Sequence, residues 1–399
     1  MKAALLAVPL ALLVLIAAGV VLWSSYRVPV HRDAASVPSR AEAAAVEGYA
    51  EPAAEASRLA KALVAAHGIP GLSAAVAVDG RVAWTEAFGW ADVENRTQVT
   101  PRTRFRLGAL SKPLTAMAAA RLHEQGRLDL DAPVQRYVGA YPAKAWPLTT
   151  RQLLGDVGGV HRIRGDNNDA MPATHCDNLD DAVALLAGDP LLFEPGTQHR
   201  YSIWGWVLVS AAVQGAAGEP FGRVMDREVF VPLGMTRTMP EETDTLVDVA
   251  HGPGGGPDYS CLAGGGAFLS TPADLVRLGS AILRPGFLRA ETIADLQRPT
   301  RLASGVPTTY ALGWTVGTAQ MAGAPVRVVS HRGSPAGGSA TLLTFPDLGL
   351  AVAVAANVTD AGGVGPFALE VAGAFARKRG APAQPTTRTS PPSNAPEDH

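Results

Sequence analysis

Hydrophobic and polar positions change their spacing along the chain, and each spacing predicts a kind of element. Between residues 51 and 66, Leu59, Leu63 and Val64 recur at helical spacing, and a glycine and a proline follow. The next stretch, LSAAVAVDGRVAWTEAFGWADVE, alternates small apolar and polar residues around Asp79-Gly80, a pair that favours a hairpin turn. The pattern therefore predicts a helix followed by two antiparallel strands.

The remainder of the chain divides into a helical middle and a β-rich end. Residues 111–238 have a mostly helical pattern that glycines and prolines interrupt. Three β-rich runs follow, VRVVSHRG, GSATLLTF and LGLAVAVAAN, and then a helical pattern over 366–379. We expect one α+β domain over 49–379, with a sheet built from both ends of the chain, a helical lobe inserted at about 106–259, and a cleft between them.

The two ends of the chain differ from this domain in composition. Residues 3–23 carry no charge and are long enough to cross a bilayer as a helix, so residues 1–26 predict a membrane anchor, with a cleaved signal peptide as the alternative. Residues 27–48 are interpreted as a linker, and the Pro/Ser/Thr-rich residues 380–399 as a disordered tail. We expect the domain on the periplasmic or extracytoplasmic side of the inner membrane.

Charge and metal-ligand types exclude several functions. A formal net charge of -2 over 399 residues, without a basic cluster, gives no reason to expect nucleic acid as a partner. The nine histidines lie in no zinc-ligand spacing, and we expect neither a metal nor a cofactor. The two cysteines, Cys176 and Cys261, could pair in an oxidising compartment, which the sequence leaves open.

One segment carries recognisable chemistry. FRLGALSKPLTAMAAARLHEQGRLDLDAPVQRYV resembles the serine β-lactamase and penicillin-binding-protein family, in which a helix begins with S-x-x-K. One helical turn there brings the serine nucleophile beside the lysine that removes its proton. The resemblance identifies Lys112 as that lysine and places Ala109 where the serine would stand. Ser111 adjoins Lys112 and points about 100° away around a helix.

Two further elements of the family are compared in the same way. The family's Tyr-x-Asn triplet resembles YSI, in which Tyr201 matches the tyrosine and Ile203 replaces the asparagine. The Lys/His-x-Gly triplet resembles HRG, which begins at His331, ends at Gly333 and is followed by Ser334. In the family, the backbone N–H groups of the nucleophile and of the residue after this triplet form the oxyanion hole, so Ala109, Gly333 and Ser334 are the implied substrate-binding residues.

The likeness extends beyond these motifs. The stretches GIPGLSAAVAVDGRVAWTEAFGWADVENR and CLAGGGAFLSTPADLVRLGSAIL resemble the mitochondrial serine β-lactamase-like proteins and their bacterial relatives. Together the matches span about residues 68–357, and they imply the β-lactamase/transpeptidase fold. The family's His-x-Ser-Gly loop reads DVGG from Asp156 here, a third departure inside the expected cleft.

Three hypotheses about function follow. The first is a catalytically impaired pseudoenzyme that binds a peptide or another carbonyl-containing ligand through Lys112, Tyr201 and His331, the implied catalytic positions. The second is an active β-lactamase, peptidase or esterase that uses a displaced serine, such as Ser111 or Ser334. The third is a scaffold or assembly protein whose partner the sequence does not name.

Overall fold

The computed structural model describes residues 30–42, 46–161, 175–241, 248–250, 257–321 and 323–379. The expected membrane anchor at 1–26 and the expected tail at 380–399 lie outside this part of the chain. Within the described ranges, no helix is long and apolar enough to span a bilayer.

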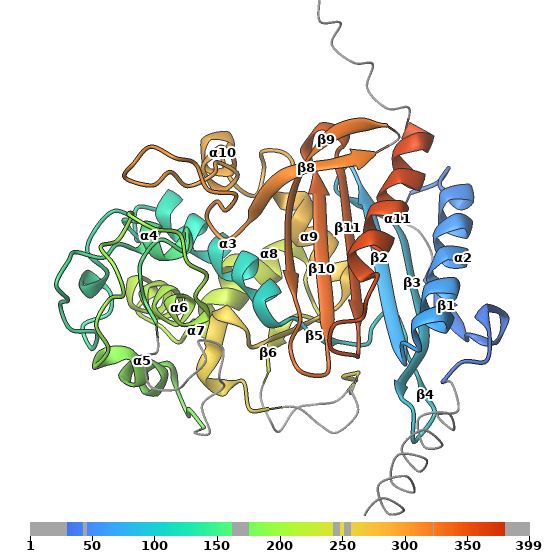
Figure 1. The fold of residues 1–399 in the computed structure, drawn as a ribbon, viewed down its shortest axis with the longest axis horizontal. Helices are drawn as coiled ribbons and strands as arrows, with labels where there is room; N and C mark the ends of the chain where they lie inside the picture. Colours follow the sequence, from blue (N-terminus) through green and yellow to red (C-terminus); the bar gives the residue numbers. More distant parts are fainter. Residues whose placement is uncertain are drawn as a thin grey trace, which may run out of the picture.

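A large antiparallel sheet dominates one side of the molecule (Figure 1). Its strands run in the order β1-β3-β2-β11-β10-β9-β8, and β4 pairs with β3 beside this path. The strands are β1 (Ser39–Ala41), β2 (Gly71–Val78), β3 (Arg81–Asp92), β4 (Thr97–Gln98), β8 (Thr315–Met321), β9 (Ala324–Gly333), β10 (Ser339–Phe345) and β11 (Leu350–Ala356). Strands from both ends of the chain therefore meet at the β2–β11 pair, as the sequence pattern predicts.

Helices cover both faces of this sheet. The amphipathic helices α2 (Ala50–His67) and α11 (Val364–Arg379) pack on one face, and α9 (Pro272–Ala281) packs on the other. Successive residues of β11 alternate between two buried clusters: Leu350, Val352 and Val354 face α2 and α11, whereas alanines face α9. The alanines leave room for α9 to approach the sheet closely: a Cβ at Gly279 of α9 would lie only 3.3 Å from the Cβ of Ala351.

The second lobe is mostly helical and lies beside the α9 face (Figure 1). Its helices are α3 (Ser111–Glu124), α4 (Thr150–Leu154), α5 (Leu179–Ala187), α6 (Ile203–Ala217), α7 (Phe221–Met225) and α8 (Val231–Leu233), with α10 (Ala290–Leu296) nearby. Shorter helical turns are η1 (Ala34–Ser36), η2 (Gly108–Leu110), η3 (Val134–Arg136), η4 (Asp226–Phe230), η5 (Ser260–Gly265) and η6 (Pro346–Leu348). A small sheet of β5 (Phe105–Arg106), β7 (Phe268–Ser270) and β6 (Met239–Pro240) joins the lobes.

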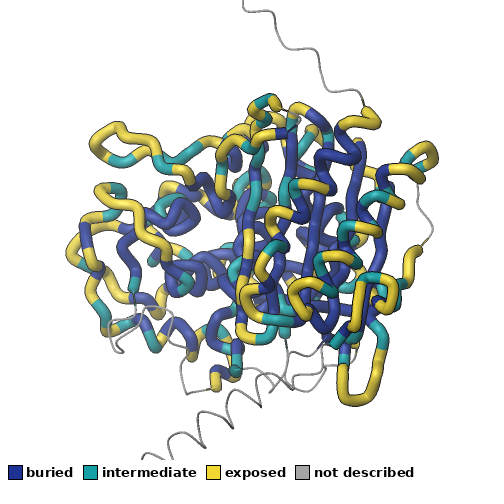
Figure 2. Tube along the Cα trace, turned by 45° about the vertical axis from the view of Figure 1, so that its right-hand side comes forward, coloured by how far each residue is buried: buried dark blue, intermediate teal, exposed yellow. Residues whose placement is uncertain are grey.

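Burial follows this two-lobe plan. Figure 2 shows the buried trace concentrated in the sheet and in the central helices, with exposed segments at the periphery. In α6, Trp204 and Trp206 are both almost completely buried, and α3 is buried along most of its length. The motif-bearing start of α3 therefore sits deep in the molecule rather than on its surface.

The linker expected over 27–48 needs a correction. Residues 39–41 form β1, which pairs antiparallel with β3 so that Ser39 faces Phe88. Val37 is buried, and the buried His31 donates a hydrogen bond to the carbonyl of Pro70 at 3.2 Å. Composition favours a spacer here because strand pairing at a sheet edge uses backbone groups and needs few apolar side chains.

Candidate active-site cleft

A cleft of about 950 Å³ lies where the sheet meets the helical lobe. Residues from η2, the end of β9, the start of α6 and the segments before η5 and β8 line it. Ala109, Tyr201, His331, Gly333 and Ser334, all singled out from the sequence, lie on this one cavity. Lys112 is fully buried just beneath it.

Backbone contact between η2 and the end of β9 forms the floor of the cleft. A Cβ at Gly333 would lie 1.8 Å from the carbonyl oxygen of Leu107, so only glycine fits at this position. Gly108 has φ +51°, and a Cβ there would lie 2.8 Å from Pro335. The two glycines let η2 and the end of β9 approach closely, so the backbone at Ala109 lies near the backbone that leads to Ser334.

The side chain of Lys112 points from the first turn of α3 into a closed polar nest. Its Nζ donates to Asp156 Oδ2 and to the carbonyl oxygen of Ser202, each at 3.5 Å. The ammonium lies 3.6 Å from the ring centroid of Tyr201, which covers it on the cleft side and is 40% exposed. Lys112 and Tyr201, both of which the family resemblance named as implied catalytic positions, are therefore in contact.

Asp156 completes this nest from the loop after α4. Its Oδ1 accepts a hydrogen bond from the indole N–H of Trp206 at 3.1 Å. Burial raises the pKa of Asp156, while the charge of Lys112 and the Trp206 hydrogen bond oppose that rise. The backbone has φ +53° here, a conformation that aspartate tolerates better than most residues with a Cβ.

His331 forms a second polar pair, with Tyr310. Its Nδ1 lies 2.9 Å from the carbonyl oxygen of Arg332, which can only accept, so Nδ1 carries the hydrogen. Its Nε2 therefore accepts from the hydroxyl of Tyr310 at 3.0 Å. Burial, and secondly the charge of Lys112, lowers the pKa of His331 to about 3, and burial raises the pKa of Tyr310 well above its usual value. The pair is neutral at pH 7.

The pH dependence of stability should report this neutral histidine. An unfolded histidine takes up its proton near pH 6.5, whereas folded His331 does so only near pH 3. Its stabilising contribution should be complete above pH 6.5 and fall by up to about 1.4 kcal/mol per pH unit as the pH drops through that window. Urea unfolding at several pH values from 7.5 to 4.5 measures this. The free energy of unfolding should depend less steeply on pH in His331→Gln than in wild type, and equal dependences would contradict a buried neutral His331.

The two serines considered as displaced nucleophiles have different positions. Ser111 is fully buried, and its Oγ accepts from the backbone N–H of Phe268 at 3.2 Å, on the side of α3 that faces β7. Ser334 is exposed on the cleft, and its Oγ accepts from the N–H of Asp360 at 3.2 Å. Ile203, at the start of α6, lines the cleft with an apolar side chain.

Several cleft residues were missed from the sequence. Tyr310, Trp206, His199 and Tyr259 all lie on or directly beneath the cleft. Their only sequence signal is an aromatic or a histidine near a glycine-rich turn, which is too common to single out a site. Among the described residues, no group of three or more His, Cys, Asp or Glu side chains is arranged to hold a metal ion.

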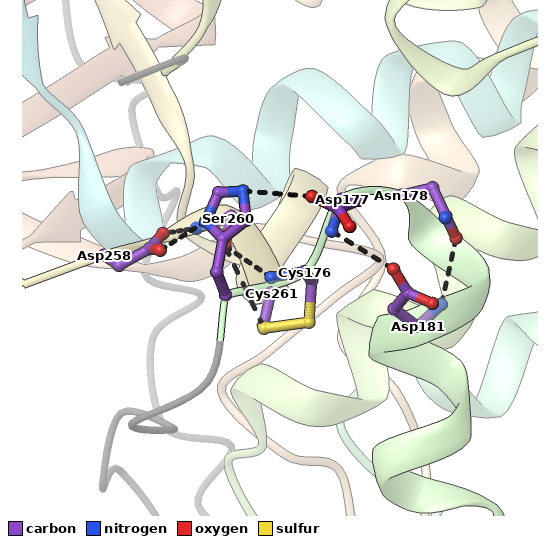
Figure 3. The surroundings of a disulfide bond; sticks show 8 residues. Cys176, Asp177, Asn178, Asp181, Asp258, Ser260 and Cys261 are labelled. Carbon is purple, nitrogen blue, oxygen red and sulfur yellow. Dashed lines mark hydrogen bonds and ion pairs between the residues drawn. A yellow bond between two sulfur atoms is a disulfide. The ribbon is translucent and has the colours of Figure 1, made fainter. Parts of the chain in front are cut away.

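Cys176 and Cys261 form a disulfide whose sulfur atoms lie 2.01 Å apart (Figure 3). The bond joins the segment before α5 to η5, next to Tyr259, which lines the cleft and accepts a hydrogen bond from Ala336 N–H at 2.7 Å. Beside the bond, the Asp258 carboxylate contacts His175 Nδ1, and Ser260 Oγ accepts a hydrogen bond from the Cys176 N–H at 3.0 Å. The disulfide therefore secures the loop that forms one cleft wall.

A sheet with helices on both faces, an inserted helical lobe, and a lysine, tyrosine and histidine gathered at their junction define the β-lactamase/transpeptidase class of α+β proteins. The family model for β-lactamase matches residues 56–372, and the chain belongs to that family. The expected fold is therefore confirmed.

Individual relatives support the same assignment. The chain is 28% identical to the mouse protein named serine β-lactamase-like protein LACTB, mitochondrial, over 70% of each chain. It is 26% identical to penicillin-binding protein 4* of Bacillus subtilis, over 67% of this chain and 64% of that one.

Solved structures show the same fold at lower identity. An octameric penicillin-binding protein homologue from Pyrococcus abyssi superposes with a TM-score of 0.68 at 22% identity, over 81% of this chain and 77% of that one. D-amino acid amidase from Ochrobactrum anthropi gives a TM-score of 0.68 at 20% identity, over 82% and 99% of the two chains.

Proposed function

We propose that this protein is a β-lactamase-family pseudoenzyme that binds a peptide or another carbonyl-containing ligand in the cleft without forming an acyl-enzyme. The observation that carries the proposal is the side chain of Ala109, just before the start of α3. Ala109 lines the cleft there, three residues before Lys112, and offers a methyl group where the family's pattern has a hydroxyl. Loss of a serine nucleophile costs about 10⁶ in kcat in a comparable serine enzyme.

The surroundings of Ala109 support a cleft that still binds a ligand, rather than one that has lost its binding function together with the nucleophile. The glycine contacts at 108 and 333 still bring η2 and β9 together, and a backbone N–H donates whether its residue is serine or alanine. The cleft also combines aromatic side chains, such as Tyr259 and Tyr310, with polar ones that could orient a ligand, such as His199. A carbonyl oxygen of the ligand would accept from the N–H groups of Ala109 and Ser334.

Ser334 supports the main alternative, an active hydrolase with a displaced nucleophile, because its exposed hydroxyl lies on the cleft. The buried hydroxyl of Ser111 disfavours that residue for the same role, since it already accepts from Phe268. A labelling experiment separates the two functions.

We expect the chain from residue 30 onward to give no covalent adduct by intact mass after incubation with benzylpenicillin or a fluorophosphonate, and no turnover of a p-nitrophenyl ester. Calorimetry should detect non-covalent binding of the peptide diacetyl-L-lysyl-D-alanyl-D-alanine. Ala109→Trp should abolish that binding by filling the cleft, whereas Val306→Trp, at an exposed site outside the cleft lining, should not. A fluorophosphonate adduct that Ser334→Ala removes would overturn the proposal in favour of the active hydrolase.

A bulky residue at Gly333 would test cleft blockade poorly, because even one added carbon would lie 1.8 Å from Leu107 O and disturb the backbone. Ala109 is half-buried and adjoins open cleft volume, so it accepts the added ring with less disturbance.

A further inference from the structure

The electrostatic surroundings of Lys112 bear on whether it could act as a base. A lysine can take a proton from a hydroxyl only when its amine is neutral. Burial alone favours that neutral form, because the ammonium ion loses its hydration. Here the side chain of Lys112 has no exposed surface, so the neighbouring groups decide which form is stable.

Each described neighbour of the amine favours the charged form. The Asp156 carboxylate and the Ser202 carbonyl oxygen accept hydrogen bonds from Nζ, and the face of Tyr201 lies at cation–π distance. Only Asp156 among these carries a charge that can balance the ammonium ion. Its side chain is 2% exposed, so water screens the pair weakly.

Asp156 is itself held in place for this contact. The Trp206 indole fixes its Oδ1, which leaves Oδ2 directed at Lys112. The loop backbone accommodates the residue at positive φ, and the N–H of Arg200 donates to the Asp156 carbonyl oxygen at 2.9 Å. The carboxylate is therefore a fixed counter-ion with little freedom to leave the amine.

We propose that Asp156 is a positioning residue that holds Lys112 as a permanent ammonium ion, and that it constitutes a second block on acylation, independent of Ala109. The proposal rests on the proposed function, since it explains why that site stays silent. In an acylating relative of this chain, the serine oxygen would bond to the carbonyl carbon of a β-lactam and its proton would pass to the lysine amine. The ring C–N bond would then break as that proton is delivered to the ring nitrogen. An ammonium ion has no lone pair to take that proton.

The charge state of Lys112 can be measured directly in the unaltered chain. The sequence has five lysines, at positions 2, 61, 112, 144 and 378, so a chain from residue 30 labelled with ¹³C at lysine Cε gives four resonances. We expect the Lys112 signal, assigned with Lys112→Arg, to remain that of an ammonium ion up to at least pH 10. In Asp156→Asn it should titrate at least about one pH unit lower than in wild type, because the counter-charge is gone.

Asp156→Asn keeps an acceptor for Trp206 and a side chain of the same size, and circular dichroism checks that it folds. Asp360→Asn is the matched control, because it removes another carboxylate from the lining of the same cleft and keeps the ion pair of Lys112 with Asp156. Identical Lys112 titrations in wild type and Asp156→Asn would overturn the proposal.

The functional consequence is measured on serine revertants. Ala109→Ser alone should acylate with a fluorescent penicillin at least about tenfold more slowly at pH 7 than Ala109→Ser/Asp156→Asn, in proportion to the neutral fraction of the amine. The acylation rate of Ala109→Ser should rise with pH, and the midpoint of that rise should lie at a higher pH than in the double variant. A purely structural role of Asp156 would not shift this midpoint. Adding Lys112→Ala should remove the gain. Equal rates and midpoints, with or without Asp156, would overturn the proposal.

These outcomes are separate from those of the proposed function. Ligand binding or covalent labelling in the wild-type chain tests the pseudoenzyme assignment, whereas the lysine titration tests the counter-ion alone. A wild-type chain that labels at Ser334 while Lys112 stays charged would refute the first and leave the second standing.

Discussion

Replacing Cys176 and Cys261 together by alanine should lower the free energy of unfolding by about 4 kcal/mol. The disulfide joins residues 85 positions apart, and a cross-link of that span removes a large part of the conformational freedom of the unfolded chain. Alanine is the better substitute, because Cys261 is fully buried and serine would bring an additional hydroxyl into its site. Urea unfolding of the oxidised wild type and the double variant measures the difference.

Wild-type protein reduced with dithiothreitol is the matched control, since it loses the bond and keeps both side chains. It should unfold at nearly the same urea concentration as the double alanine variant. If oxidised and reduced wild type unfold together, the disulfide does not contribute to stability. The effect should extend to the cleft, because the bond secures η5 beside Tyr259, so ligand affinity should fall with reduction at temperatures well below unfolding.

The parts of the fold that sequence pattern predicted are those with local signals. The β2–β3 hairpin has a favoured turn at Asp79-Gly80, and helix α2 ends where glycine takes φ +60° after a regular apolar face. The edge strands β1 and β8 were not predicted. The residues of β8 are mostly exposed or half-buried, so the alternation of buried and exposed side chains that identifies a strand is weak there.

The candidate site was predictable only as far as its motifs. Lys112, Tyr201 and His331 fall in short patterns, and the structure brings all three to one cleft or directly beneath it. The sequence marked Asp156 as a departure from the family pattern, but it gave no reason to pair it with Lys112. That contact joins residues 44 positions apart, and such a pairing depends on how α4 and α3 each pack against α6. Tyr310 is similar, because its partner His331 belongs to another segment.

Lys112→Met should destabilise the protein by about 3 kcal/mol or more at pH 7, because it leaves the Asp156 carboxylate buried without its counter-charge. Methionine fills a similar volume, so lost packing contributes little. The loss should be smaller at pH 5, since Asp156 can then take up a proton and avoid burying a charge. The sign follows from its raised pKa: the folded variant binds a proton more readily than the unfolded chain, so stability falls as the pH rises.

A second substitution separates this electrostatic cost from a packing defect. Lys112→Met/Asp156→Leu removes both charges, and it should recover most of the lost stability and show little of the pH dependence. The Trp206 indole loses its acceptor in that variant, which accounts for an incomplete recovery. Chemical unfolding of wild type, Lys112→Met, Asp156→Leu and the double variant at pH 5 and pH 7.5 gives the coupling between the two sites. A coupling near zero would mean that Lys112 and Asp156 do not act as an ion pair. The proposal that Asp156 holds Lys112 in its charged form would then fail as well.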